Sequence, residues 1–293
     1  MELRVLRYFL EVAREENITK AANYLHISQP TLSRQLKDLE EELGKKLFTR
    51  SNHNIKLTDE GMLLKKRAED IIDMVDKTTD EFKALDEFVG GDIHIGCPES
   101  QGMDIVIKIA KTLQIQYPNV RFHFYSSGTD AVTQRLDNGL IDIAIIVQNV
   151  DLTKYNYLVL PHQDCWGILT KKNDALASKQ FVTVNDLMRL PLICSRQGLE
   201  DILLDWFKGA ESKMNIVATY DLLYNTGHMV RNDLGYPLGF DHILNTDDNS
   251  DLCFIPLEPK LNSPMHVIWR KYQVFTPAAQ LFLDELKSKL TPQ

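Results

Sequence analysis

The chain has 293 residues, of which 44% are hydrophobic and 25% are charged, and its formal net charge is −8. These proportions are typical of a soluble globular protein with one large domain or two to three smaller ones. No run approaches the roughly 18 apolar residues that a membrane helix needs. The N-terminal residues are charged throughout and lack the apolar core of a signal peptide. We therefore expect a cytoplasmic protein that has no membrane partner.

The cysteines and histidines do not form a metal-binding or disulfide pattern. The four cysteines contain no CxxC pair, and the eight histidines contain no HxxxH pair. This spacing argues against a zinc site and against a disulfide framework. A redox-sensing cysteine pair is the alternative, but isolated cysteines usually behave as small buried hydrophobes. We expect no metal and no cofactor.

The charge is distributed unevenly along the chain. Residues 1–67 hold 13 Lys and Arg against 10 Asp and Glu, a net charge of +3. Residues 68–293 hold 20 against 31, a net charge of −11. A basic head on an acidic body predicts that the head meets nucleic acid and that the body has another task.

The head has the pattern of three short helices. Apolar residues at helical spacing predict the first helix over residues 2–15. Thr19 is a plausible N-cap for the second helix, and His26–Ile27 makes the turn that follows it. Ser28 is a strong N-cap for the third helix, and Pro30 lies in its first turn, where a missing N–H costs nothing.

The third helix has two different faces. Leucines at spacings of 4, 3 and 4 form an apolar stripe from Leu32 to Leu43. The opposite face carries short hydrogen-bonding residues with cations beside them: Gln29, Pro30, Thr31, Ser33, Arg34 and Lys37. Such side chains can contact base edges and phosphates in a major groove. The alternative is the solvated face of an ordinary helical bundle.

A small two-stranded wing is predicted after Gly44. Apolar pairs at Leu47–Phe48 and at residues 55–57 flank a polar SNHN tip. Arg50 and His53 on this wing are candidate contacts to DNA phosphates.

These motifs together resemble a known family. The residues that carry the resemblance are Phe9, Val12, Thr19, Ala21, Ala22, Leu25, Ser28, Gln29, Pro30, Ser33, Leu39, Glu40, Leu43, Gly44, Leu47, Phe48 and Arg50. Their spacing resembles the winged helix-turn-helix of LysR-type transcriptional regulators over nearly all of the first 60 residues. The resemblance implies a DNA-binding head over residues 1–58, a linker helix that dimerises and a C-terminal effector-binding domain. It also implies tetramers, and RNA polymerase becomes a further candidate partner.

A long linker helix is predicted over residues 59–89, with Thr58 as its cap. Its apolar residues alternate at spacings of 4 and 3: Leu64, Ala68, Ile71, Val75, Thr78, Phe82 and Leu85. A repeat of 3.5 residues is typical of a coiled-coil seam and favours dimerisation, since paired heads read paired half-sites of DNA. The alternative is a helix that packs on its own domain. Gly90-Gly91 would end the segment as a flexible joint.

Strands alternate with helices in the body, residues 90–293. The βαβαβ order over residues 91–147 predicts a parallel sheet. The body resembles the effector domain of the same family, which has the two-lobed fold of periplasmic solute-binding proteins. The resemblance implies lobe one over about 90–160 and 269–293, and lobe two over about 161–268. The expected fold is thus α/β, with a mainly helical winged head, a linker helix and a two-lobed body.

Candidate effector contacts follow the strands, because ligands in such folds bind at strand C-terminal ends between the lobes. The candidates are Ser100, Gln101, Gly128, Thr129, Gln148, Ser195, Arg196, Gln197 and Thr226. Free N–H groups of helix starts and a bidentate Arg196 would suit an anionic small molecule. Glu99 brings a negative charge to the same place and departs from this pattern. The alternative for each residue is a helix cap or an exposed loop.

The leading hypothesis is a transcription factor that binds double-stranded DNA and responds to a small-molecule effector. A solute-binding transport component is the first alternative, but the basic head and the missing signal peptide argue against it. An enzyme is the second alternative. Asp164 and His162 are acid and base candidates, yet no Ser-His-Asp order, nucleophile elbow or phosphate loop is present.

Overall fold

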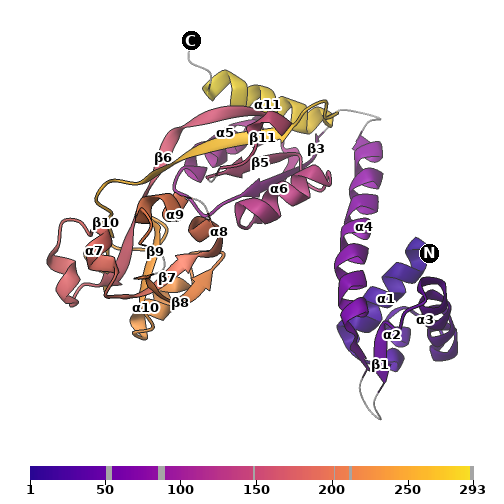
Figure 1. The fold of residues 1–293 in the computed structure, drawn as a ribbon. Helices are drawn as coiled ribbons and strands as arrows, with labels where there is room; N and C mark the ends of the chain where they lie inside the picture. Colours follow the sequence, from indigo (N-terminus) through magenta and orange to yellow (C-terminus); the bar gives the residue numbers. More distant parts are fainter. Residues whose placement is uncertain (51–54, 85–89, 148, 201, 211–212, 291–293) are drawn as a thin grey trace. The chain divides into compact units, whose positions relative to one another are not determined.

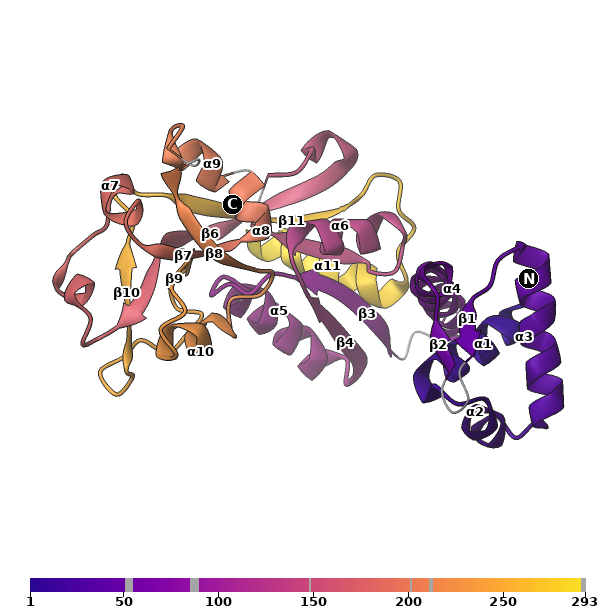
Figure 2. The ribbon, with the colours of Figure 1, turned by 60° about the horizontal axis from the view of Figure 1, so that its bottom comes forward.

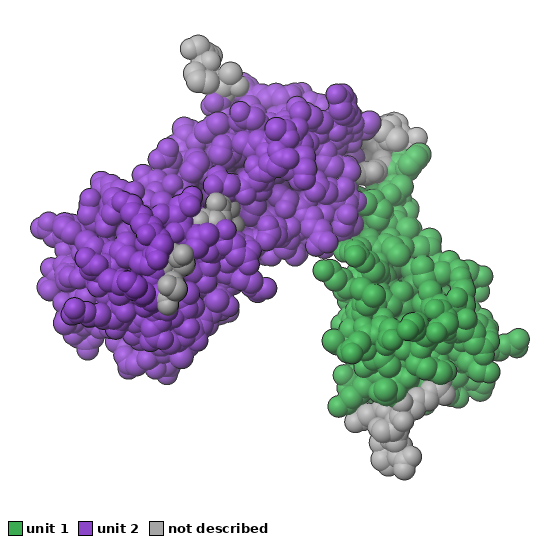
Figure 3. Space-filling model, viewed as in Figure 1, with its two compact units in different colours: residues 1–83 green, residues 84–293 purple. Residues whose placement is uncertain are grey.

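The computed structural model of the chain describes residues 1–50, 55–84, 90–147, 149–200, 202–210 and 213–290. The chain divides into two compact units, residues 1–83 and residues 84–293 (Figure 3). Each unit has its own hydrophobic core. Among the described helices, none is long and apolar enough to cross a membrane.

The first unit is a three-helix head followed by a two-stranded wing and a long helix (Figure 1). Its elements are α1 (Leu3–Glu15), α2 (Ile18–Tyr24), α3 (Gln29–Leu43), β1 (Phe48–Arg50), β2 (Ile55–Leu57) and α4 (Asp59–Ala84). The wing strands are antiparallel, with Phe48 opposite Leu57. The expected helices and wing are therefore confirmed.

The caps of α2 and α3 show how local chemistry sets the turn between them. Asn17, rather than the expected Thr19, caps α2, because its side chain accepts the N–H of Lys20. Thr19 lies one residue inside the helix. His26 has a φ of 54°, a left-handed conformation that reverses the chain. Ser28 accepts the N–H of Thr31 and begins α3 as predicted.

The buried leucines of α3 fix the orientation of that helix. Leu32, Leu36 and Leu39 are buried among α1, α2 and the wing, together with Phe9. Phe9 also packs against Phe48 of the wing, with the rings tilted and their centroids 5.2 Å apart. The stripe weakens at its end, because Leu43 is exposed beside the left-handed C-cap Gly44.

A buried carboxylate ties the end of α3 to the wing. Glu40 accepts the N–H groups of Leu47 and Phe48 at 2.9 and 3.3 Å, and Lys46 donates to it at 2.8 Å. Burial raises the pKa of Glu40, but the Lys46 and backbone donors together lower this pKa below its ordinary value. Glu40 is therefore charged and satisfied in the folded head.

The linker helix α4 packs partly on its own head. Thr58 caps it by accepting the N–H of Gly61 at 2.9 Å. Ala68 and Ile72 are buried in the head core, and Ile71 packs at its edge. The first half of the apolar stripe on α4 therefore packs on the head of the same chain. Phe82, further along α4, is 69% exposed.

The second unit is built on a single mixed sheet that runs through both lobes. The elements of its first part are β3 (Gly90–Cys97), α5 (Met103–Gln116), β4 (Asn119–Ser126), α6 (Thr129–Asp137), β5 (Ile143–Ile146), η1 (Leu152–Lys154) and β6 (Tyr155–Lys171). Next come η2 (Ala175–Ser178), α7 (Val184–Leu187), β7 (Pro191–Ser195), α8 (Arg196–Glu200), α9 (Ile202–Phe207) and β8 (Asn215–Tyr220). The last are α10 (Thr226–Arg231), β9 (Tyr236–Phe240), β10 (Leu252–Pro256), β11 (Asn262–Arg270) and α11 (Pro277–Leu290).

The strand order is β4-β3-β5-β11-β6-β9-β7-β8, and β10 pairs with β6. Parallel pairing holds for β4-β3-β5 and for β8-β7-β9, as the βαβ order predicts. Every pair that includes β6 or β11 is antiparallel. The sheet is therefore mixed, because these two strands run from one lobe into the other and back.

Alternation along the strands builds the core on both faces of the lobe-one sheet. Ile143 and Ile145 face α5 and α11, whereas Ala144 and Ile146 face α6. Figure 1 shows α11 and α6 on opposite sides of the strands, and Figure 2 shows α5 and α6 on opposite sides of β3 and β4. A strand that is buried on both faces is a continuous apolar run, as the sequence IAII shows. This packing sets the N-terminus of α6 at the carboxyl ends of the strands.

Glu40→Ala should destabilise the head by about 1–3 kcal/mol, because it leaves two buried N–H groups without their acceptor. Hydrogen exchange of peptides from residues 29–48 would measure the loss of protection. Glu41→Ala, an exposed neighbour, is the control and should change protection little. Because the pKa of Glu40 is lowered on folding, its contribution to stability is present above the unfolded Glu pKa of about 4.3 and is lost as the pH falls from there through the lower folded-state pKa. Equal protection in Glu40→Ala and wild type would contradict this role.

Candidate functional site

The polar face of α3 is exposed on the first unit. Gln29, Pro30, Thr31, Arg34 and Lys37 are exposed, and Ser33 is half-buried. Two of these side chains are ordered by local bonds: Gln29 donates to Ser33 at 2.8 Å, and the Thr31 and Ser28 hydroxyls lie 2.7 Å apart. The face thus presents hydrogen-bonding groups in fixed positions along one helix.

The two cations of this face are paired only weakly. Arg34 is 83% exposed and lies 4.0 Å from Asp38, while Lys37 lies 3.3 Å from Glu41. Exposed pairs at spacing i,i+4 contribute about 0.3–0.5 kcal/mol, so these cations can leave their partners for a phosphate at little cost. Arg50 is the last residue of β1, and His53 lies outside the described residues.

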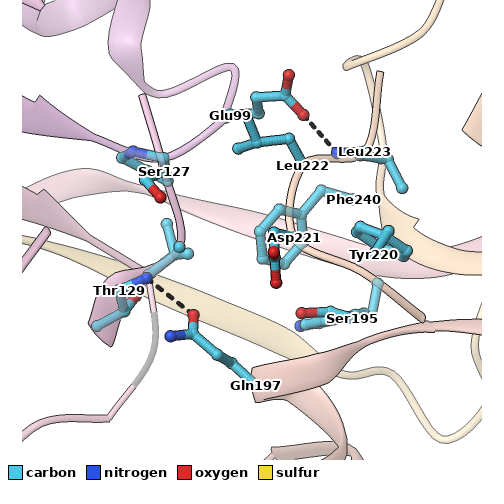
Figure 4. Close-up of a pocket in the computed structure, with 14 residues that line it drawn as sticks. Glu99, Ser127, Thr129, Ser195, Gln197, Tyr220, Asp221, Leu222, Leu223 and Phe240 are labelled. Atoms are coloured by element: carbon cyan, nitrogen blue, oxygen red, sulfur yellow. Dashed lines mark hydrogen bonds between the residues drawn. The ribbon is translucent and has the colours of Figure 1, made fainter. Parts of the chain in front are cut away.

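A cavity of about 50 Å³ lies between the lobes of the second unit (Figure 4). Residues that follow strands of both lobes line it: Pro98, Glu99, Ser127, Gly128, Thr129, Val147, Trp166, Ser195, Gln197, Tyr220, Asp221, Leu222, Leu223 and Phe240. Their positions agree with the general placement of ligand sites at strand C-terminal ends.

Four of the predicted effector contacts line this cavity: Gly128, Thr129, Ser195 and Gln197. Ser100, Gln101, Arg196 and Thr226 do not line it, and Gln148 lies outside the described residues. The side-chain contacts of Ser100, Arg196 and Thr226 explain their positions.

Ser100 is held by a buried carboxylate. Its hydroxyl donates to Asp164 at 2.7 Å, and His162 Nε2 lies 3.0 Å from the other oxygen of Asp164. Burial raises the pKa of Asp164, against the lowering effect of Ser100 and His162. This cluster anchors the loop that carries Glu99 and Gln101 to strand β6.

Arg196 forms an ion pair with Asp221, the neighbouring acid, where the sequence predicted a contact with a ligand. Its Nη2 atom lies 2.7 and 2.6 Å from the two oxygens of Asp221, and both side chains are exposed. Thr226 is fully buried and donates to the carbonyl of Leu223 at 2.7 Å. These contacts arrange the second lobe at the rim of the cavity.

Two sets of hydrogen bonds join the lobes across the cavity. The N–H of Thr129, at the start of α6, donates to Oε1 of Gln197 at 2.8 Å. Glu99 Oε2 accepts the N–H groups of Leu223 and Tyr224, at 2.5 and 3.1 Å. Figure 4 shows the Thr129–Gln197 bond and the Glu99–Leu223 bond at opposite sides of the cavity. Gln197 therefore occupies the Thr129 N–H, one of the helix-start donors that the sequence suggested for an anion.

The aromatic wall was not predicted. Trp166 of β6 and Phe240 of β9 are cross-strand neighbours with ring centroids 4.6 Å apart. Trp166 donates to Ser263 at 2.9 Å, and Tyr220 donates to the carbonyl of Leu238. Burial raises the pKa of Tyr220, so its hydroxyl stays neutral. The positions of these rings depend on strand pairing over long sequence separations, which no local pattern specifies.

The described residues contain no group of three or more His, Cys, Asp or Glu side chains placed to hold a metal ion. The four cysteines are free thiols. Burial raises the pKa of Cys194 to about 12, which keeps this thiol protonated.

The two units define a class of protein. An exposed polar helix on a small winged head, joined to a two-lobed body with a cavity between its lobes, is the architecture of a ligand-responsive DNA-binding regulator. Comparison with known proteins then specifies the family. Residues 3–62 match the family described as "Bacterial regulatory helix-turn-helix protein, lysR family", and residues 87–291 match the "LysR substrate binding domain".

Known proteins resemble this chain over most of its length. The HTH-type transcriptional regulator BsdA of Bacillus subtilis (strain 168) is 37% identical over 199 residues, which is 67% of this chain and 67% of BsdA. The HTH-type regulator YwbI of the same organism is 29% identical over 296 residues, which is 99% of this chain and 97% of that protein. The crystal structure of CbnR, a LysR family transcriptional regulator, matches with a TM-score of 0.74 at 19% identity and covers 100% of both chains.

The chain belongs to the LysR family of transcriptional regulators. It is a regulator with a DNA-binding helix-turn-helix and an effector-binding domain, and its family is not one of enzymes.

Removing an interlobe bond should open the cavity. Gln197→Ala removes the acceptor of the Thr129 N–H, and a hydrogen bond is worth about 0.5–1.5 kcal/mol, so the open population should rise about two- to tenfold. Acrylamide quenching of Trp166, which is 2% exposed, should increase. Trp166→Phe identifies the contribution of this tryptophan, and Gln280→Ala on α11 is the control. Quenching at the wild-type level in Gln197→Ala would show that the bond does not hold the lobes together.

Proposed function

We propose that α3 enters the major groove and that its exposed face reads the operator. Gln29, Thr31 and Arg34 would contact bases, with Ser33 and Lys37 on the backbone phosphates. Pro30 lies among them in the first turn of the helix. The single observation that supports this assignment best is the division of α3 into a buried leucine face and an exposed polar face. A structural neighbour of 20% identity, full-length CbnR, was solved in complex with its target DNA, with a TM-score of 0.70.

The wing has a supporting role in this proposal. Arg50 and His53 would contact phosphates beside the groove, as the resemblance to winged helix-turn-helix proteins suggests. Such contacts strengthen binding without sequence preference. We also propose the division of labour along the chain as residues 1–58 for DNA, 59–89 for dimerisation and 90–293 for effector binding.

We propose that a small-molecule effector binds between the lobes. Gly128, Thr129, Ser195 and Gln197 would contact it directly, since they line the cavity. Ser100, Gln101 and Arg196 would act from the rim, through Asp164 and Asp221. Thr226 and Gln148 are weaker candidates. The charges around the cavity are the best guide to the charge of the effector.

We propose that the chain forms dimers through α4 and tetramers through further contacts, and that it acts in the cytoplasm, where bacterial DNA lies. Met62, Leu63 and Phe82 of α4 are exposed apolar side chains, which supports a partner along this helix. A dimer presents two heads to two half-sites. RNA polymerase stays a candidate partner, because a regulator of transcription acts on the step that this enzyme performs.

Arg34→Ala should weaken operator binding about 5- to 150-fold, because one good base or phosphate contact is worth about 1–3 kcal/mol. A gel shift with DNA from upstream of the gene that encodes this protein would measure the change. Arg189→Ala, an exposed arginine of the second unit, is the matched control. Unchanged affinity in Arg34→Ala would exclude this face of α3 from the groove.

Phe82→Asp should raise the dissociation constant of the dimer by about tenfold or more, since it places a charge in an apolar helix contact. Sedimentation velocity over a concentration series would measure the shift toward monomer. Thr79→Asp adds the same charge at an exposed position outside the apolar stripe and is the control. A dimer equally stable in both variants would place the interface elsewhere.

A further inference from the structure

The charge and lining of the cleft specify the kind of effector, provided that the cleft is the effector site as proposed above. We infer that the effector is not a carboxylate or another anion but a small molecule that presents a protonated amine to the cleft and an apolar body to its aromatic wall. This conclusion reverses the expectation of an anion that the helix starts and Arg196 suggested.

The first argument is charge. Among the described residues that line the cavity, the charged side chains are Glu99 and Asp221, and no Lys, Arg or His is present. Arg196 neutralises Asp221 through two short contacts, so Glu99 leaves the lining with a net negative charge. Bringing an anion out of water beside an unneutralised carboxylate is unfavourable, because burial strengthens the repulsion. A cation in the same place is attracted to the Glu99 carboxylate, and burial strengthens this attraction.

The second argument is the state of the hydrogen-bond donors. An anion needs N–H or O–H donors, and three backbone N–H groups at the cavity already have acceptors within the protein. Thr129 N–H is bonded to Gln197, and the N–H groups of Leu223 and Tyr224 are bonded to Glu99 Oε2. Neither of the Glu99 bonds uses Oε1, which can accept from an ammonium group. The remaining donors on the lining are the side chains of Ser127, Ser195 and Gln197, which can bind a neutral polar group as well as an anion.

The third argument is the wall. Trp166, Tyr220 and Phe240 are aromatic residues of the cavity lining, and Leu222 and Leu223 add apolar surface. Aromatic faces attract cations, and tryptophan does so most strongly. An organic ammonium thus finds both a carboxylate and aromatic residues in this lining, whereas a carboxylate ligand is repelled by Glu99.

The fourth argument is size. A cavity of about 150 Å³ accommodates benzene, and the closed cleft holds about 50 Å³. An effector that is larger than a few atoms and lies fully between the lobes must therefore part them and break the Gln197 and Glu99 bonds. When the lobes part, Glu99 loses the N–H groups of Leu223 and Tyr224. A bound amine then pairs with the Glu99 carboxylate, whereas a bound acid leaves this carboxylate without a partner. This asymmetry favours the amine in the open cleft as well.

The test uses two matched series of probes with the full-length protein. Benzylamine, benzyl alcohol and benzoate share one ring, and butylamine, butanol and butyrate share one chain. At pH 7 the amines should raise the unfolding temperature, the alcohols less, and the acids not at all. Isothermal titration should give amines an affinity roughly tenfold or more above the matched acids.

Charge-removing variants identify the site of binding. Glu99→Gln should lower amine affinity and narrow the difference between amine and acid, and Asp221→Asn provides a second test if Glu99→Gln folds poorly. Asp284→Asn, an exposed acid on α11, is the control and should leave both affinities unchanged. Tighter binding of the acids, binding of neither series, or amine binding that neither variant alters would each overturn the inference.

Failure here is distinguishable from failure of the proposed function. If the acids bind and Ser195→Ala weakens them, the cleft is still the effector site and only the charge class is wrong. If no ligand of either series binds, the inference fails, while operator binding by α3 is tested independently in the gel shift.

Discussion

The two lobes of the body share two strands, and the site depends on this constraint. Strand β6 runs from Tyr155 to Lys171 and pairs with β11 in lobe one and with β9 and β10 in lobe two. Asp164 and Trp166 lie near the middle of β6, where the strand leaves one lobe for the other. The strand that connects the lobes therefore also carries the anchor of the Glu99 loop and one aromatic wall. A change in the angle between the lobes must move the site itself.

The same physical device recurs in the head at a smaller scale. Glu40 accepts hydrogen bonds from the backbone N–H groups of Leu47 and Phe48, as Glu99 does from those of Leu223 and Tyr224. Glu40 joins residues 7 and 8 positions apart, whereas Glu99 joins residues 124 and 125 positions apart. The difference lies in exposure: Glu40 is buried against Lys46, whereas Glu99 faces a cavity. A buried contact of this kind rigidifies a structure, but one at a cavity can be exchanged for a ligand.

Local sequence patterns predicted the local structure well. The cap at Ser28, the wing, the Thr58 cap and the β3–α5–β4–α6–β5 order all rest on residues close in sequence, and the structure has each of them. The site was harder to predict, because distant partners decide where its side chains go. Ser100 faces Asp164, 64 residues away, and Arg196 faces Asp221. No helix or strand period contains that information.

The heptad-like stripe of α4 illustrates the same limit. Spacings of 4 and 3 describe a coiled-coil seam and a helix that packs on its own domain almost equally well over three heptads. The head core takes Ala68 and Ile72, so the first half of α4 is used inside the unit. Only apolar residues that the head does not cover, such as Phe82, are free to contact a partner helix.

The interlobe bonds bear on how a ligand could act as a signal. A ligand shifts an equilibrium between open and closed lobes only by the difference in its affinity for the two states. Here the closed state already satisfies Thr129, Leu223 and Tyr224 with protein oxygens. A ligand that merely reproduced those bonds would gain little over the closed protein. A ligand that is too large for the closed cavity and pairs with Glu99 in the open state binds the open state alone. Such selective binding is the condition for a switch.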